Sequence, residues 1–176
     1  MGDRGTRLMA KADGQLSETI EFFATLEEAD LRKACTDEGA EDSSGGTVAA
    51  VAAHTAEGYH QLGRFLRAAG YVPGLPETGS DRGRGHGGRD RGQDRGQEHR
   101  HAHGHAPDAL PDMRGRLSEG KVPIGLLAEL TDEQLDGLPP AGSSPFSDGR
   151  RTLDRVIEAA IAHQAAHLLA LKRAVA

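Results

Sequence analysis

The sequence predicts an all-α fold, a bundle of three to four helices, from three observations. Several long stretches place apolar residues at every third or fourth position, which is the period of an amphipathic helix. No stretch has the strict apolar–polar alternation of a half-buried strand. Aromatic residues make up only 3% of the 176 residues, so a core must be built mainly from Ala, Leu, Val and Ile, which suits packed helices.

The first helical segment spans about residues 6–35. Its apolar residues recur every three or four positions, and its glutamates occupy the positions between them. Gly14 weakens this segment, because glycine is a poor helix former, and the helix could begin only near Gln15. Residues 36–46 are polar and glycine-rich, which predicts a connector.

Residues 47–70 form the second predicted helix. Thr47 suits the N-cap position, and Gly70 is a typical residue after a helix end. On a helical wheel His54 lies at the edge of the apolar arc, where it can face a core. His60 falls among charged residues, so we expect it to face solvent.

The third helical region lies between residues 108 and 135. Ile124 and Leu130 delimit a short apolar segment, and Thr131 with Gln134 has the spacing of a capping box. Residues 136–151 then read as a loop leading into the last helix.

The last predicted helix covers residues 152–176, which contain neither proline nor glycine and suffice for about six turns. His163 and His167 lie in the middle of its apolar arc, opposite the charged side chains. Their spacing stacks two imidazoles one turn apart, where both can bind one metal ion. Two buried histidines with ordinary hydrogen bonds are the alternative, and the pair alone favours neither.

Residues 75–108 differ from the rest of the chain. They hold short Asp-Arg-Gly repeats followed by four alternating histidines, His99, His101, His103 and His105. Such a composition predicts a disordered insertion within one domain that spans residues 1–176. The histidine run could bind transition metals, although a soluble low-complexity linker is the favoured interpretation.

Composition narrows the functional classes. The net charge of −6, with scattered arginines, disfavours nucleic acid as a partner, and no apolar run is long enough to span a membrane. The absence of a signal-peptide pattern and the single cysteine, Cys35, predict a cytoplasmic protein. Arginine far outnumbers lysine and asparagine is absent, which hints at a GC-rich bacterial source.

Three candidate metal ligands emerge from these predicted helices: His54 from the second, and His163 and His167 from the last. In an antiparallel bundle, a histidine on one helix can face an i, i+4 pair on its neighbour. Three nitrogens then fill three corners of a tetrahedron. A fourth position left open for water or substrate is typical of catalytic zinc.

The chain also resembles the DinB/YfiT-like family of metal-binding four-helix bundles. The likeness rests on TVAAVAAHTAEGYHQL, on LLAELTDEQLDGLPP and on FSDGRRTLDRVIEAAIAHQAAHLLALKRAV, in this order, and covers about residues 6–74 and 118–176. It implies an antiparallel four-helix bundle with His54, His163 and His167 as the metal triad. Two departures are the missing tryptophan before the second helix and the long insertion before the third.

The resemblance implies a metal-dependent enzyme that transfers or isomerises through a thiol. Zinc is the first choice of divalent metal and nickel the second, and the thiol would be mycothiol or another low-molecular-weight thiol. The metal-bound thiolate would attack an electrophilic small molecule. The alternative functions are a non-catalytic metal buffer, sensor or chaperone that also uses the histidine run, and a bundle with a vestigial triad. A homodimer would be reasonable if an apolar face is exposed.

Other residues are weaker candidates for a functional role. Cys35 has no histidine nearby in sequence, so packing is its favoured role. Tyr59 lies on the apolar arc and could donate to a metal-bound species, but a buried tyrosine bonded to backbone is preferred. The glutamates at 57 and 158 should be solvated. The arginines at 150 and 151 could contact an anionic thiol or substrate.

Overall fold

The computed structural model describes residues 2–36, 46–73 and 109–176. The secondary-structure elements within these residues are all helices. The elements are α1 (Asp3–Thr25), η1 (Asp30–Arg32), α2 (Val48–Ala68), α3 (Leu110–Glu119), α4 (Lys121–Gly125), η2 (Leu126–Glu129), α5 (Asp132–Asp136) and α6 (Leu153–Val175). The all-α prediction is therefore confirmed for the described residues. The predicted insertion at 75–108, with its histidine run, lies outside them.

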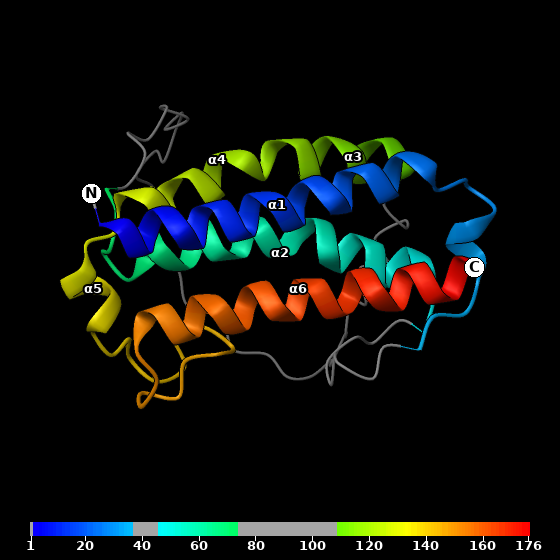
Figure 1. Ribbon diagram of the computed structural model, residues 1–176. Coiled ribbons are helices and arrows are strands. Elements are labelled where there is room, and N and C mark those ends of the chain that lie inside the picture. Colours follow the sequence, from blue (N-terminus) through cyan, green and yellow to red (C-terminus); the bar gives the residue numbers. More distant parts are fainter. Residues whose placement is uncertain (1, 37–45, 74–108) are drawn as a thin grey trace, which may run out of the picture.

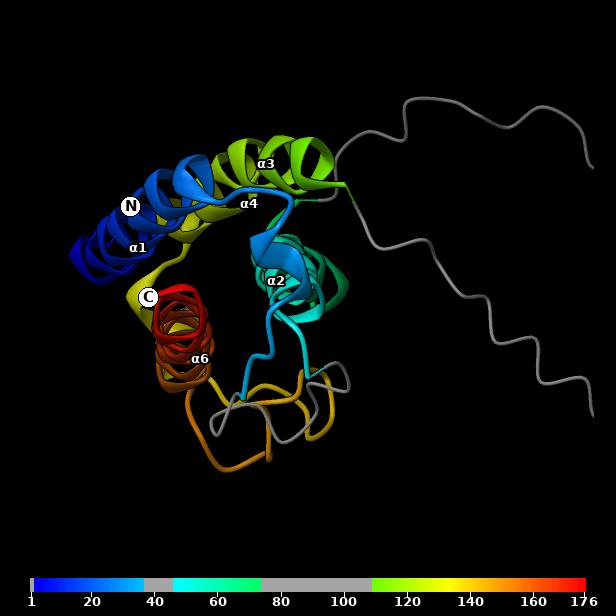
Figure 2. The ribbon, with the colours of Figure 1, turned by 90° about the vertical axis from the view of Figure 1, so that its right-hand side faces the viewer.

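Three long helices and the α3–α4 segment lie side by side around a common interior (Figures 1 and 2). α6 packs against α1 and α2, and the α3–α4 segment packs against the same two helices from the other side. The enclosed core is made mostly of leucine, valine, isoleucine and alanine, as the composition predicts. No helix in the described part of the chain is long and apolar enough to cross a membrane.

The directions of the helices can be followed along the chain in Figure 1. α2 and α6 run in opposite directions. α2 and the α3–α4 segment instead run in the same direction, and so do α1 and α6. This arrangement leaves the end of α2 and the start of α3 at opposite ends of the molecule (Figure 1).

α1 differs from its predicted limits at both ends. It starts at Asp3 and continues through Gly14, because Ala12, Leu16 and Phe23 hold its inner face in the core. The Gly14 position is exposed and carries no packing, so the glycine costs only its weak helix propensity. The helix ends at Thr25 rather than near residue 35. At this observed end, Arg114 of α3 donates hydrogen bonds to the carbonyls of residues 23, 24 and 26.

The predicted helix caps are confirmed. The Thr47 hydroxyl accepts a hydrogen bond from the backbone N–H of Ala50 at 3.3 Å, and α2 ends at Ala68, two residues before Gly70. At the start of α5, Thr131 and Gln134 exchange both hydrogen bonds of a capping box. These caps are local in sequence, which explains why periodicity and residue type were sufficient to place them.

Candidate metal centre

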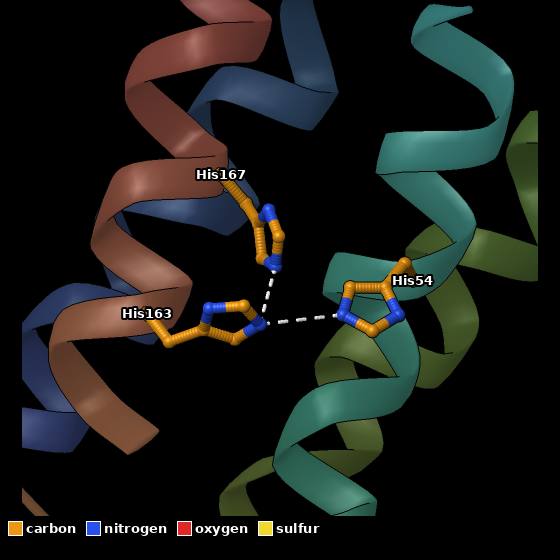
Figure 3. Close-up of side chains that lie close together, drawn as sticks. All are labelled: His54, His163 and His167. Atoms are coloured by element: carbon orange, nitrogen blue, oxygen red, sulfur yellow. Dashed lines mark hydrogen bonds between the residues drawn. The ribbon is translucent and has the colours of Figure 1, made fainter. Parts of the chain in front are cut away.

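α2 and α6 bring the three predicted histidines together in the interior (Figure 3). The four-residue spacing along α6 places His163 and His167 one above the other, and both point toward α2. His54 points back at them from the facing side of α2. The sequence-predicted triad is thus one spatial cluster, formed by residues 109 or more positions apart across the two helices.

The ring nitrogens of the triad have spacings suited to a shared cation. Nε2 of His54 lies 3.5 Å from Nε2 of His163, and Nε2 of His167 lies 2.8 Å from that same His163 atom. Zinc–nitrogen bonds of about 2.0–2.1 Å in a tetrahedron place two nitrogens about 3.3–3.4 Å apart. The first separation matches this value, and the second requires His167 and His163 to part by roughly half an ångström.

Burial differs among the three histidines. His167 is fully buried, whereas His54 and His163 are half-buried. The His163 and His167 rings stand edge to face with centroids 4.1 Å apart, and the Phe146 ring packs against His163 at 5.2 Å. A cation held here would therefore be enclosed on the His167 side.

The donor set fits a divalent transition metal. Three converging nitrogens cannot all carry protons, because their N–H groups would then face one another, whereas a cation takes one lone pair from each neutral ring. Imidazole suits zinc, nickel, copper and iron. Three neutral ligands leave the full charge of the metal uncompensated, which is the condition for Lewis-acid chemistry at a remaining open position.

A cavity of about 650 Å³ borders the triad between α2, α6 and the loop at residues 143–146. His54 and His163 line this cavity, and His167 lies outside its lining. A cation bound by all three histidines would therefore be adjacent to a space of the size that holds small molecules in proteins, about 300–1,000 Å³.

Tyr59 is buried and lines the same cavity. Its hydroxyl is hydrogen-bonded at 3.2 Å to the Thr19 hydroxyl of α1, not to backbone as predicted. Burial raises the pKa of Tyr59 to about 12, so its hydroxyl remains protonated at neutral pH.

His60 was predicted to face solvent, and this prediction is wrong. Its Nε2 lies 2.9 Å from the backbone carbonyl oxygen of Arg116, and the residue is only partly exposed. The wheel of α2 alone could not show that α3 packs on that side of the helix. His60 is separate from the triad and makes a matched control for it.

The other ranked residues lie away from the cavity lining. Cys35 is buried, with 2% of its surface exposed. The glutamates at 57 and 158 form ion pairs with arginines 64 and 155 rather than standing alone in solvent. The exposed arginines 150 and 151 donate their backbone N–H groups to Asp148, in the turn before α6.

Sequence reasoning missed several residues of the cavity wall, among them Gln164, Phe146 and Arg64. Gln164 follows a predicted ligand but looks like an ordinary polar residue of a helix. Phe146 belongs to a segment read only as a loop. A signal for Gln164 was present in Gly58, since a glycine inside an otherwise regular helix often marks a close approach by another group.

Neither a protein-family model, a curated protein nor a solved structure matches this chain.

Proposed function

We propose that this chain is a metal-dependent enzyme of the DinB-like type, in which His54, His163 and His167 hold one divalent metal ion. The observation that carries the proposal is the convergence of three imidazole nitrogens within 4.8 Å of one another beside a cavity large enough for a substrate. Zinc is the proposed metal, because a neutral three-histidine set with an open position is typical of catalytic zinc.

The proposed fold is the DinB-like four-helix bundle, with α1, α2, the α3–α4 segment and α6 as its four helices. Two features support it: the core enclosed by these elements, and the packing of α2 against α6 in opposite directions (Figure 1), which juxtaposes the triad. The proposed location is the cytoplasm of a bacterium, as the sequence composition suggests.

The proposed reaction is transfer to, or isomerisation through, a low-molecular-weight thiol such as mycothiol. A metal at the triad would supply Lewis acidity that lowers the pKa of a thiol bound beside it. The sulfur would form a bond to an electrophilic carbon of the substrate, whose leaving group departs with the bonding pair, while the thiol proton passes to solvent. The cavity walls would hold the electrophile.

Metal content of untagged protein tests the metal part of this proposal. Elemental mass spectrometry should find about one metal per chain in the wild type, none in the triple variant His54→Ala/His163→Ala/His167→Ala, and the wild-type amount in His60→Ala. Loss of metal in His60→Ala, or its retention in the triple variant, would contradict the assignment.

Turnover tests the enzymatic part. Metal-loaded protein with mycothiol should consume chloro-, epoxide- or quinone-type electrophiles faster than His167→Ala does. Equal rates across the whole panel would count against thiol transfer while leaving the metal site intact.

A metal-binding protein without catalysis is the second candidate. It is favoured by the alternating histidines 99, 101, 103 and 105, which offer additional imidazoles. A buffer or chaperone should bind several metals per chain, whereas an enzyme needs one tight site.

A further inference from the structure

The wall of the cavity beside the triad is mostly apolar. Its apolar lining includes Leu62, Phe65, Phe146, Val156, Ala160 and Ile161. Arg64 is the one Lys, Arg, Asp or Glu among the lining residues described, and its guanidinium is paired with the Glu57 carboxylate. A wall of this kind favours an uncharged ligand with an apolar body, because a charged group would lose its hydration without gaining an unpaired partner.

Polar residues also line this cavity: Tyr59, Gln61, Ser143, Ser144 and Gln164, besides the two histidines. Among these described residues, Gln164 is the one with a buried polar side-chain atom that lacks a hydrogen-bond partner. The residue is 7% exposed and lines the cavity, and its Oε1 atom is buried without a hydrogen-bond partner. A buried acceptor without a partner is unfavourable, and such groups in native proteins commonly mark a position filled by water or a ligand. The last torsion of glutamine is broad and twofold, so the carboxamide can turn either end toward a bound molecule.

Gly58 of α2 makes the room that this carboxamide occupies. A Cβ atom at position 58 would lie 1.9 Å from Nε2 and 2.6 Å from Cδ of Gln164. Glycine weakens a helix interior, so its presence in the middle of α2 has a packing reason. Two separate observations therefore concern the Gln164 carboxamide: Gly58 leaves room for it, and its oxygen has no hydrogen-bond partner.

We infer that Gln164, seated over Gly58, is the specificity-determining residue of this cavity, and that it binds a small uncharged apolar molecule through a hydroxyl or amide N–H donor. The ligand donates its hydrogen bond to Oε1 of Gln164, and its apolar body lies against the α2 and α6 side chains. The identification of this molecule as the electrophile of a metal-dependent reaction rests on the proposed function. The selection of a hydrogen-bond donor by the cavity is independent of that function.

A pair of probes that differ only in the donor tests this inference. We would titrate 4-propylphenol and its methyl ether, 4-propylanisole, into metal-loaded full-length protein and measure both dissociation constants by calorimetry. One net hydrogen bond corresponds to a preference of roughly 2–13-fold for the phenol. Gln164→Leu should reduce this preference to about one while the protein keeps its metal. Any direct contact of the phenol with the metal remains in this variant, so the change isolates the carboxamide.

Gly58→Ala provides a second route to the same result. Its methyl group should displace the Gln164 carboxamide and remove the preference, whereas Gly14→Ala, on an open face of α1, should leave it unchanged. An unchanged preference in Gln164→Leu, or failure of both probes to bind the wild type, would overturn the inference. Loss of the metal assignment with a retained phenol preference would instead overturn only the proposed function.

Discussion

The three histidines of the triad are not equivalent. His167 is fully buried and His54 and His163 border the cavity, so replacing His167 removes the ligand on the enclosed side of the site. We expect His167→Ala to weaken zinc binding by more than about 100-fold, beyond the roughly 10–100-fold effect of outer partners. Competition with a chromophoric chelator measures this, with His60→Ala as the control. Equal affinities for the two variants would contradict the assignment.

Tyr59 should make stability depend on alkaline pH. Its pKa of about 12 in the fold lies above the ordinary value of 10.0, so the stabilisation from neutral tyrosine is fully present below pH 10 and is lost as the pH rises to 12. Two pKa units correspond to about 2–3 kcal/mol. Urea unfolding between pH 9 and 11.5 should therefore show a flatter decline for Tyr59→Phe than for the wild type. Parallel declines would show that Tyr59 ionises freely.

The same Tyr59→Phe variant should fold well at neutral pH. The substitution removes the hydrogen bond between the hydroxyls of residues 59 and 19, but Thr19 still donates to the carbonyl of Gln15 at 2.9 Å. A loss of about 0.5–1.5 kcal/mol is expected. Tyr71, whose pKa burial also raises, is present in both proteins, so its contribution cancels from the difference.

Periodicity was sufficient to identify the triad and insufficient to describe its surroundings. His54, His163 and His167 lie on apolar arcs, and an apolar arc is a property of one helix that the sequence displays. His60 and Gln164 depend on which helix packs opposite them. The carbonyl that His60 contacts and the glycine beneath Gln164 belong to other elements, so a wheel of one helix contains no information about either.

At the scale of elements, α1 is held against η2 by a close backbone approach. A Cβ atom at Gly5 would lie 2.6 Å from the carbonyl oxygen of Leu127 and 2.9 Å from that of Leu130. Backbone cannot move aside as a flexible side chain can, so Gly5→Ala should destabilise the fold by about 1–3 kcal/mol. Gly14→Ala, in the same helix but in open space, should stabilise it by up to about 1 kcal/mol.

Urea denaturation of the two α1 variants checks this pair. Opposite signs are expected, because both substitutions improve helix propensity and only one creates a clash. If Gly5→Ala also stabilised the protein, the close packing of α1 on η2 would be disproved.

The short helix α5 has one contact that the sequence predicts and one that it does not. The capping box of α5 was readable from Thr131 and Gln134, because both partners lie within one turn. The same Gln134 also donates from its Nε2 to the carbonyl oxygen of Tyr71 at 2.9 Å, which ties α5 to the segment after α2. That contact joins residues 63 positions apart, and nothing local to either residue predicts it.

For the whole molecule, the direction of the helices constrains how the histidine run can be tested. Tyr71, after α2, lies beside α5 near the start of α1, whereas Arg114 of α3 binds the end of α1. The chain between them must therefore cover about 30 Å, roughly the length of the 21-residue α2. A large deletion between residues 74 and 108 would leave few residues to cover this distance, and could damage the fold for that reason alone.

Replacing His99, His101, His103 and His105 by serine avoids this problem, because the chain length is unchanged. The triad draws its three ligands from α2 and α6, so about one tightly bound metal per chain should remain. Elemental mass spectrometry after exhaustive dialysis measures the tight site, and calorimetric zinc titration counts weaker ones. A wild type that binds several zinc ions, reduced to one by the serine variant, would assign the extra ions to the run. A serine variant without metal would move the tight site from the triad to the histidine run and would contradict the proposed enzyme.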